Sequence, residues 1–177
     1  GFIGSGNIDT NSRLCMSSSV VGHKRAFGTD TVPGCYEDFE DAALIILVGS
    51  NTAWCHPVLF QRIKLHKEKN PNVKVIVIDP RVTATCDISD LHLKLNLGTD
   101  VWLFNGLLSY LAEHQHLDHD YIKNYCQGFD EALNMAQQSC GDIAHNADAI
   151  GISEDDLTTF YSWFANTKKV VTLYSQG

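Results

Sequence analysis

The chain has 177 residues, of which 44% are hydrophobic and 19% are charged, as is ordinary for a globular α/β protein with a core of its own. Its formal net charge of −8 argues against non-specific nucleic-acid binding, which depends on cations that neutralise phosphates. No apolar run approaches the roughly 20 residues of a membrane-spanning helix, so we expect neither a nucleic acid nor a membrane as a partner.

In chain order, the first strong pattern is the apolar run over residues 43–51, which predicts a buried strand of a parallel sheet. Residues 56–70 then predict a helix, because Pro57 suits a first turn and apolar residues recur along one side. The side chains expected on that inner side are Val58, Leu59, Ile63 and Leu65. Residues 73–80 predict a second buried strand, stopped by Pro80. Residues 91–100 alternate like a short, half-exposed strand and then turn at Gly98.

The second half of the chain is mostly helical in pattern. Helices are expected over residues 101–114, 118–126, 129–138 and 153–167. Asp100 is placed as the N-cap of the first of these helices, and Ser153 as the N-cap of the last. Residues 168–177 close the chain with a third buried strand.

This alternation of strands and helices predicts an α/β fold: a Rossmann-like, doubly wound, mostly parallel sheet with helices on both faces. We expect a single domain over residues 1–177. The chain has no initiator Met and no signal-like start, and it stops directly after an apolar run. We therefore expect it to be an excised central portion of a larger protein, called the parent below.

The cysteines are far apart in the sequence and form no C-x-x-C pair. A zinc ribbon or an iron–sulfur cluster is therefore not expected within this chain. A chain of this size with a good core does not need a disulfide framework, so reduced thiols are expected. The six positions are Cys15, Cys35, Cys55, Cys86, Cys126 and Cys140.

Parallel sheets bind ligands beyond the carboxyl ends of their strands, which directs attention to the loops after Val48, Ile78, Leu97 and Tyr174. In the first loop, Gly49 lets a ligand approach the backbone closely. The short polar side chains that follow it, before a helix start, are Ser50, Asn51 and Thr52. The loop lacks the G-x-G-x-x-G pattern of dinucleotide-binding turns, so a plain capped loop is an equal alternative.

The second loop holds Asp79, whose carboxylate can accept hydrogen bonds from a ribose or a base, and Arg81, which can pair with phosphate. On these residues alone, a turn begun by Asp79 and a solvated Arg81 is the better reading. The third loop ends in Asp100, whose carboxylate can accept from guanine N1–H and N2–H₂ together, with Gly98 opening the approach. A helix N-cap is the commoner use of an Asp at such a place.

Cys15 lies between a polar loop and a run that looks helical. A helix N-terminus lowers the pKa of a thiol, and Arg13 nearby would do the same. The resulting thiolate is the form that ligates metals or acts as a nucleophile. The alternative is a small buried residue packed under the helix, which is common for free cysteine. The other five cysteines lack this setting and are read as structural.

These sites occur together in one family. The chain resembles the central part of a molybdenum bis-molybdopterin-guanine-dinucleotide nitrate reductase. The motifs that carry the resemblance are NIDTNSRLCMSSSVVG, GCYEDFEDA, VGSNTAWCHPVLFQRI, VIDPR and LGTD. Their order and spacing match the family up to Asp100, and the later region matches more loosely, as helices leading to the closing strand.

The resemblance implies a role for each matching position. Cys15 matches the cysteine whose thiolate ligates molybdenum, and Asn11 matches a cofactor-contacting position just before it. Three further stretches match cofactor-binding loops, of which the third reads the guanosine end. Their residues are Val48, Gly49, Ser50, Asn51, Thr52, Ala53, Trp54 and Cys55; then Asp79, Pro80, Arg81, Val82 and Thr83; and finally Gly98, Thr99 and Asp100.

Met16 after Cys15 follows the nitrate reductase pattern, since related formate dehydrogenases typically have His there and sulfoxide reductases use Ser as the ligand. The motifs look more like the assimilatory, cytoplasmic branch than the periplasmic one. The resemblance implies a Mo-bis(molybdopterin guanine dinucleotide) cofactor, nitrate as substrate, an electron donor protein or domain, and a 4Fe–4S cluster elsewhere in the parent. Because one domain offers only one wall of the cofactor cavity, the isolated chain is expected to be inactive.

Other readings stay open. One is a different bis-molybdopterin-guanine-dinucleotide oxidoreductase, such as a formate dehydrogenase. Another is a non-catalytic α/β domain that binds a free nucleotide through Gly49, Asp79 and Asp100, in which Cys15 would not matter. A third is a structural or interaction domain. No residue is singled out as a general acid or base.

Overall fold

The structure is a computed structural model that describes residues 2–175 and divides them into two compact units, residues 2–35 and 36–175. The first unit holds a 3-10 helix, η1 (Asn11–Arg13), and α1 (Ser17–Phe27). None of its described residues is buried. The expectation of one domain across the whole chain stays a prediction.

The second unit is built on one sheet of four parallel strands in the order β3-β2-β1-β4. The strands are β1 (Leu44–Val48), β2 (Lys74–Ile78), β3 (Leu91–Leu93) and β4 (Val170–Tyr174). The last residue of β1 pairs with the last residues of both β2 and β4, so three strands end at the same level.

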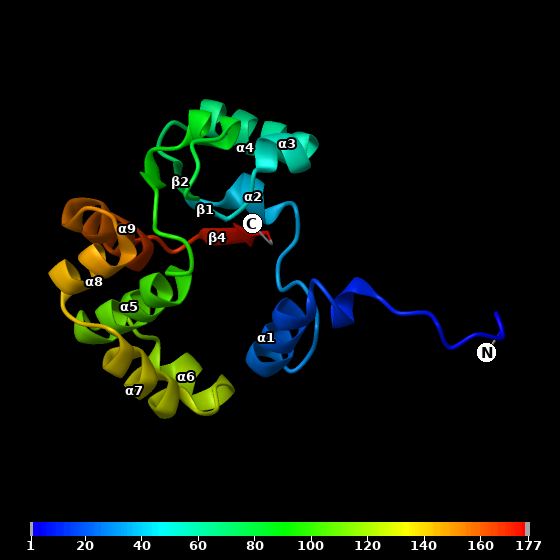
Figure 1. Cartoon of the computed structure of the whole chain (residues 1–177). Helices are drawn as coiled ribbons and strands as arrows, with labels where there is room; N and C mark the ends of the chain where they lie inside the picture. The colour runs from blue at the N-terminus through cyan, green and yellow to red at the C-terminus, as the bar shows by residue number, and fades with distance from the viewer. Residues whose placement is uncertain (1, 176–177) are drawn as a thin grey trace. The chain divides into compact units, whose positions relative to one another are not determined.

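Helices connect these strands, as the colour sequence of Figure 1 shows. Before β2 come α2 (Asp38–Asp41), α3 (Thr52–Cys55) and α4 (Pro57–Lys69). A second 3-10 helix, η2 (Ala84–Ile88), follows β2. Between β3 and β4 come α5 (Asp100–Glu113), α6 (His119–Tyr125), α7 (Phe129–Ser139), α8 (Ile143–Ile150) and α9 (Glu154–Asn166).

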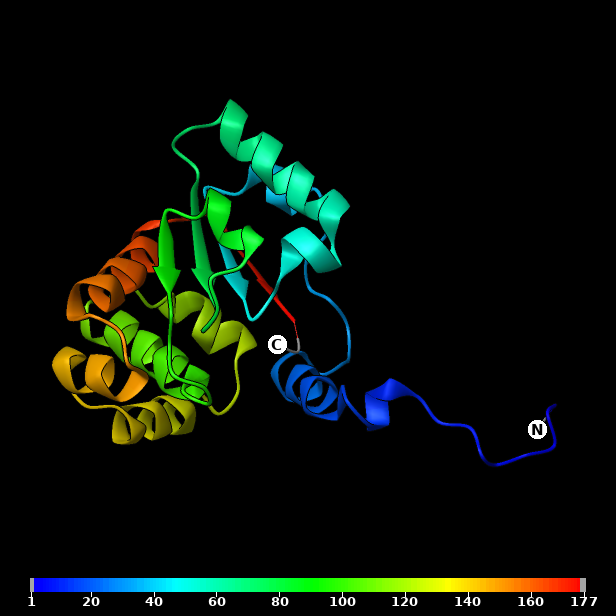
Figure 2. The same ribbon diagram turned by 45° about the horizontal axis from the view of Figure 1, so that its top comes forward.

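Alternate strand residues enter two different cores, one on each face of the sheet. Leu44 and Ile46 pack with side chains of α5, α8 and α9, whereas Ile45 and Leu47 pack with Phe60 and other side chains of α2 and α4. Figure 2 shows α4 on one side of the sheet and α8 and α9 on the other. The predicted α/β fold, with a parallel sheet and helices on both faces, is therefore confirmed.

The contact between α5 and α9 depends on a glycine. Tyr161 is 1% exposed, and its hydroxyl donates a hydrogen bond to the Leu103 carbonyl oxygen at 3.0 Å. A Cβ atom at Gly106 would lie 2.2 Å from that hydroxyl oxygen, so only glycine fits there without a shift. Burial also raises the pKa of Tyr161 above its usual range, because the phenolate form would lose its hydration.

Several local expectations were wrong in detail. In α4 the buried residues are Phe60 and Ile63, whereas Val58 is 76% and Leu65 50% exposed. Val58 and Leu65 are seven residues apart and share a helix face, but that face points away from the sheet. No helix was expected at α8, whose N-terminus is capped by Asp142.

Two strand predictions also change. β3 ends at Leu93, not Leu97, because it pairs with only three residues of β2. β4 is half-buried or exposed along its length and is not a buried strand, since within residues 2–175 it lies at the edge of the sheet and pairs with β1 alone. Residues 176–177 of the predicted closing strand lie outside the described residues.

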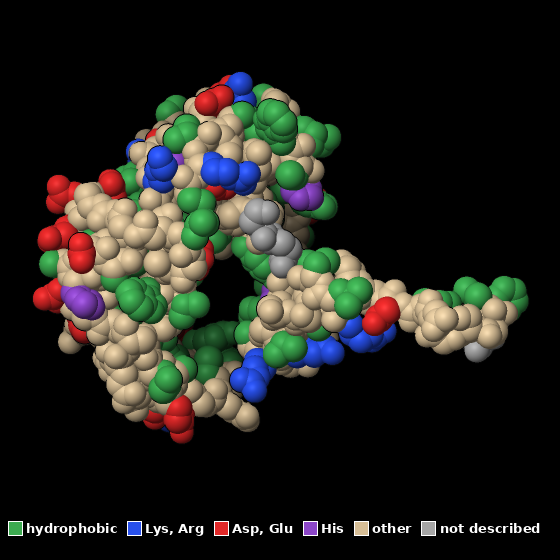
Figure 3. Space-filling view, viewed as in Figure 1, with side chains coloured by type: hydrophobic (Ala, Val, Ile, Leu, Met, Phe, Trp, Pro, Cys, Tyr) green, Lys and Arg blue, Asp and Glu red, His purple; other side chains and the backbone are tan. Residues whose placement is uncertain are grey.

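Acidic side chains gather over α8 and α9, at the left of Figure 3. Glu154, Asp155 and Asp156 occupy the first turn of α9, where carboxylates are favoured by the helix dipole, and Ser153 caps that helix as predicted. Of the helices in the described part of the chain, none has the length and apolar character that crossing a bilayer requires.

Candidate cofactor-binding site

The candidate site begins where β1, β2 and β4 end together. The Gly49 backbone N–H donates to the Ile78 carbonyl oxygen at 2.8 Å, and the Ser175 N–H donates to the Val48 carbonyl oxygen at 3.1 Å. These bonds extend the ladder one step past the strands. The first residues of the loops are therefore held by the sheet itself.

The loop after β1 turns sharply and buries its hydroxyl groups. Gly49 has φ +54°, a conformation that favours glycine. Ser50 and Thr52 are 1% and 0% exposed, and their hydroxyl oxygens lie 3.0 Å apart. The Ser175 hydroxyl donates to the Ser50 hydroxyl oxygen at 2.8 Å. Two of the predicted binding residues thus stabilise the loop from inside, while Trp54 is 77% exposed.

Thr85 of η2 joins the loop after β2 to the loop after β1. Its hydroxyl donates to Asn51 Oδ1 at 3.2 Å and accepts from the Ala53 backbone N–H at 3.1 Å. The side chain is fully buried. The structure therefore brings the first two predicted cofactor stretches together through a residue that the sequence analysis missed. Nothing in the local pattern distinguishes Thr85 from Thr83, because only the fold shows which hydroxyl points toward Asn51.

Asp79 is 2% exposed and serves its own loop. Its Oδ1 accepts from the Arg81 backbone N–H at 2.8 Å and lies 3.4 Å from the Arg81 Nε. His92 of β3 donates from Nε2 to the Asp79 carbonyl oxygen at 2.8 Å. The carboxylate therefore fixes the turn, and the Arg81 side chain stays 61% exposed.

Thr83 leaves an unfilled hydrogen bond in this loop. Its hydroxyl oxygen is buried and has no hydrogen-bond partner among the described residues. Buried polar groups are normally paired, so an orphan of this kind needs an explanation. A polar ligand at the carboxyl edge of the sheet would supply the missing partner, and the residues present therefore fit a nucleotide-bearing group there.

The third predicted stretch is more open. Gly98 has φ +80°, and no atom lies within 4 Å of the position that a Cβ would take there. The Thr99 hydroxyl donates to the Asn96 carbonyl oxygen at 2.7 Å. Asp100 is the first residue of α5 and not its N-cap, which is Thr99. Within residues 2–175 the exposed Asp100 carboxylate has no hydrogen-bond partner, so both oxygens remain available. No hydrogen bond within the described chain joins this stretch to the other two.

Cys15 belongs to the first unit, two residues before α1. Its thiol is free and exposed, which rules out the alternative of a small residue packed under the helix. Arg13 forms an ion pair with Asp9. Among residues 2–175, no group of three or more His, Cys, Asp or Glu side chains is placed to hold a metal ion. One thiol from this unit fits a metal whose other ligands come from a cofactor.

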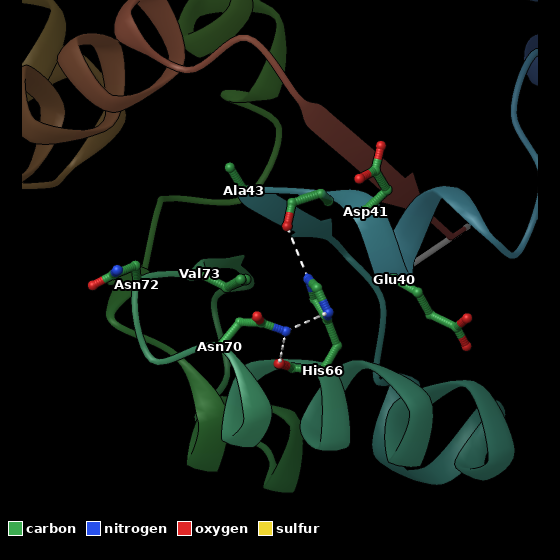
Figure 4. Close-up of a pocket in the computed structure, with 8 residues that line it drawn as sticks. Glu40, Asp41, Ala43, His66, Asn70, Asn72 and Val73 are labelled. Carbon is green, nitrogen blue, oxygen red and sulfur yellow. Dashed lines mark hydrogen bonds between the residues drawn. The ribbon is translucent and has the colours of Figure 1, made fainter.

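A hollow of about 270 Å³ lies at the opposite edge of the sheet, by the amino ends of β1 and β2. Figure 4 shows His66 between Ala43 and Asn70 in this hollow. The His66 ring contacts the Ala42 carbonyl oxygen through Nε2 at 2.9 Å and Asn70 Nδ2 through Nδ1 at 3.2 Å. Both ring nitrogens are therefore occupied, and His66 ties α4 to the start of β1.

The chain matches known proteins along its whole described length. A model of the molybdopterin oxidoreductase family matches residues 2–175. The chain is 52% identical over 177 residues to a nitrate reductase of Shewanella frigidimarina and 49% identical over 177 residues to one of Klebsiella oxytoca. All of the chain is covered in both cases, but it spans only 19% and 20% of those two proteins.

One further relative and one solved structure are named for other activities. The chain is 39% identical over 171 residues to the alpha subunit of an F420-dependent formate dehydrogenase of Methanococcus maripaludis, with 97% of this chain and 25% of that protein covered. The structure superposes on acetylene hydratase from Pelobacter acetylenicus with a TM-score of 0.81 at 23% identity, over 99% of this chain and 23% of that protein. The latter likeness concerns the fold alone.

Proposed function

Because the chain belongs to the molybdopterin oxidoreductase family, we propose that it forms one part of a molybdenum-dependent nitrate reductase, which reduces nitrate to nitrite. The observation that carries the proposal is the pair of loops after β1 and β2. They are locked together at the carboxyl edge of the sheet and leave the buried Thr83 hydroxyl without a partner among the described residues. The high identity to nitrate reductases favours nitrate among the substrates of the family.

In this proposal Cys15 ligates the metal through its thiolate. Its exposure leaves the sulfur accessible, and no other cysteine matches the family motif. The bound molybdenum centre supplies two-electron oxygen-atom transfer. The chain's part is to hold that centre through one soft sulfur ligand, which helps to set its potential.

The loops after β1 and β2, together with Gly98–Asp100, form the proposed wall for the guanine dinucleotide part of the cofactor. Arg81 presents an exposed guanidinium that can pair with a phosphate. Asp100 presents both carboxylate oxygens and can accept from guanine N1–H and N2–H₂. Asn11 is proposed as a further cofactor contact beside Cys15.

The remaining parts of the proposal concern the parent. A 4Fe–4S cluster and an electron donor outside this chain would deliver two electrons for each nitrate. We propose a cytoplasmic, assimilatory enzyme, with the periplasmic branch as the alternative. The isolated chain is proposed to be catalytically silent, because it is about a fifth as long as the nitrate reductases it matches.

The test uses the purified parent. Molybdenum per chain, guanine nucleotide released by acid hydrolysis, and nitrite formed with a reduced viologen are measured together. Guanine nucleotide and molybdenum in the ratio that two dinucleotides per metal require, with nitrite formation, would support the proposal. A parent that contains guanine nucleotide but no molybdenum would instead be a nucleotide-binding protein.

A formate dehydrogenase is the second candidate, favoured by the identity to the methanogen enzyme. Met16 follows Cys15 here, where the formate enzymes typically carry His. The same purified parent is assayed for formate oxidation with an oxidised viologen. If the parent oxidises formate and forms no nitrite, formate replaces nitrate as the proposed substrate. The proposal for the cofactor then stays in place.

A further inference from the structure

We infer that Thr85 is a positioning residue for the proposed cofactor, acting through Asn51 of the loop after β1. The inference rests on the proposed function, since it concerns how the same wall is held in shape. Thr85 is fully buried, so it acts on a ligand only through the groups that it holds. It lies outside the three stretches that the motifs match.

The Thr85 hydroxyl both donates and accepts a hydrogen bond. A hydroxyl group has one donor, which here goes to Asn51 Oδ1, and it accepts here from the Ala53 backbone N–H. The two partners lie in one loop, more than thirty positions before Thr85 in the sequence. One side chain therefore fixes both the backbone of the first loop at Ala53 and the side chain of Asn51.

Fixing Asn51 decides what that amide offers to a ligand. A carboxamide has a hydrogen-bond acceptor at its oxygen and two donors at its nitrogen. The Thr85 hydroxyl takes one of the two lone pairs of the oxygen and so fixes which end of the amide faces Thr85, which leaves both Nδ2 donors free to meet a ligand. The half-buried Asn51 is thus set to recognise an acceptor, such as a phosphoryl or carbonyl oxygen of a guanine nucleotide. Without the Thr85 hydroxyl, the amide is free to turn over and present its oxygen to that acceptor.

The experiment replaces Thr85 in the parent by Val and by Ser. Thr85→Val keeps the side-chain shape but removes the hydroxyl, whereas Thr85→Ser keeps the hydroxyl. The matched control is Thr167→Val, because Thr167 is half-buried, donates to the Trp163 carbonyl oxygen at 2.7 Å and lies at the end of α9. The control loses the same kind of hydrogen bond elsewhere in the second unit.

Retention of cofactor is measured as molybdenum and released guanine nucleotide per chain after gel filtration, together with the melting temperature. Thr85→Val is expected to hold the cofactor roughly tenfold less tightly, because it leaves the Ala53 N–H without a partner and the Asn51 amide unrestrained. Thr85→Ser is expected to restore retention. Thr167→Val is expected to keep full cofactor content and to lower the melting temperature by less than Thr85→Val, because Thr167 is half-buried and makes one hydrogen bond.

Full cofactor content in Thr85→Val would overturn the inference, and so would equal depletion in Thr85→Ser. Equal depletion in Thr167→Val would show that lost stability alone releases the cofactor, which would also overturn it. If Thr85→Val does not accumulate, Thr85→Cys takes its place with the same expected and contrary results, because a thiol is a weak donor of similar size. Failure of the proposed function is separate: the unaltered parent would then contain neither molybdenum nor guanine nucleotide.

Discussion

The loops at the carboxyl edge of the sheet and the segment around Cys15 are held in different ways. Ser50, Thr52 and Thr85 are buried and hydrogen-bonded within and between their loops, and the sheet ladder extends into them. In the first unit, by contrast, no described residue is buried, and Arg13 and Asp9 form an exposed ion pair. Exposed pairs of that kind contribute about 0–1 kcal/mol.

The difference separates binding from chemistry. The second unit holds the proposed binding loops through buried side chains and the sheet ladder, so their shape does not need the ligand. The first unit presents a thiol on a segment with little burial to fix it, so in the proposed enzyme the metal and the rest of the parent would fix its geometry. Substitutions in the first unit should therefore lower activity far more than stability. Substitutions in the second unit should lower either stability or the retention of the cofactor.

The largest effect is expected for Cys15→Ser in the parent, with near-complete loss of nitrite formation. Oxygen is a harder ligand than thiolate sulfur, so the proposed metal centre would change in potential and geometry. The melting temperature should stay unchanged because Cys15 is exposed. Cys126→Ser, at another exposed free cysteine, is the control and should keep full activity. Wild-type turnover in Cys15→Ser with molybdenum bound would remove Cys15 as the ligand.

Asp100→Asn should act on cofactor content rather than on the fold. In the proposed complex the bound nucleotide covers residue 100, so an NH₂ group facing a guanine donor is left unpaired at a cost of about 1–3 kcal/mol, or a loss of affinity of roughly tenfold to a hundredfold. The stability should change little, because the Asp100 carboxylate caps nothing. Asp130→Asn, an exposed acid in the first turn of α7, provides the control. Equal cofactor content in both variants would move the guanine contact elsewhere.

Gly106→Ala tests the opposite side of the comparison, because it should lower stability and leave the loops intact. The added Cβ would meet the Tyr161 hydroxyl at 2.2 Å, and overpacking of this kind costs about 1–3 kcal/mol. Denaturant unfolding of the chain measures the free-energy change. Gly22→Ala in α1, where no atom lies within 4 Å of the new Cβ, should be neutral or slightly stabilising. A larger loss of unfolding free energy for Gly22→Ala than for Gly106→Ala would contradict the close packing described at Gly106.

The smallest effect is expected in alkaline solution. The pKa of Tyr161 is raised in the folded chain, so above the unfolded value of about 10 the unfolded chain loses its proton first. Between about pH 10 and about pH 11 unfolding is then favoured by at most about 1.4 kcal/mol, whereas well below about pH 10 the group has no effect. Tyr161→Phe should lose this dependence, and Cys140, whose pKa burial also raises, contributes equally to both proteins. Identical pH profiles would contradict the prediction.

The strands and the fold class follow from local patterns because continuous apolar runs at β1 and β2 are needed wherever both faces of a strand are covered. The sequence pattern did not show which face of α4 is buried. Val58 and Phe60 are both apolar, and only the packing of the helix decides which of them is buried. The apolar run of β4 predicts a buried strand, but its place at the edge of the sheet within the described residues is set by topology.

The candidate site shows the same division. Gly49 is singled out in the sequence because a glycine lets a ligand approach the backbone closely, and that role stays a prediction. The structure adds that its φ is positive, a conformation that favours glycine. Thr85 was not identified, because its role depends on contacts with residues more than thirty positions away. The sequence allows Asp79 a ligand role or a turn role. Its hydrogen bond from the Arg81 N–H shows that it shapes the turn, while the ligand role stays a prediction.

The place of β4 beside β1 also sets the order in which the sheet is completed during synthesis. Roughly 120 residues separate the end of β1 from the start of β4, which a ribosome needs about 6 to 24 seconds to add. Until then the outer edge of β1 has unpaired backbone groups flanked by apolar side chains, and such an edge can pair with other chains. We expect the nascent chain to need a chaperone over that interval, and truncation before Val170 to yield aggregates rather than a three-stranded domain.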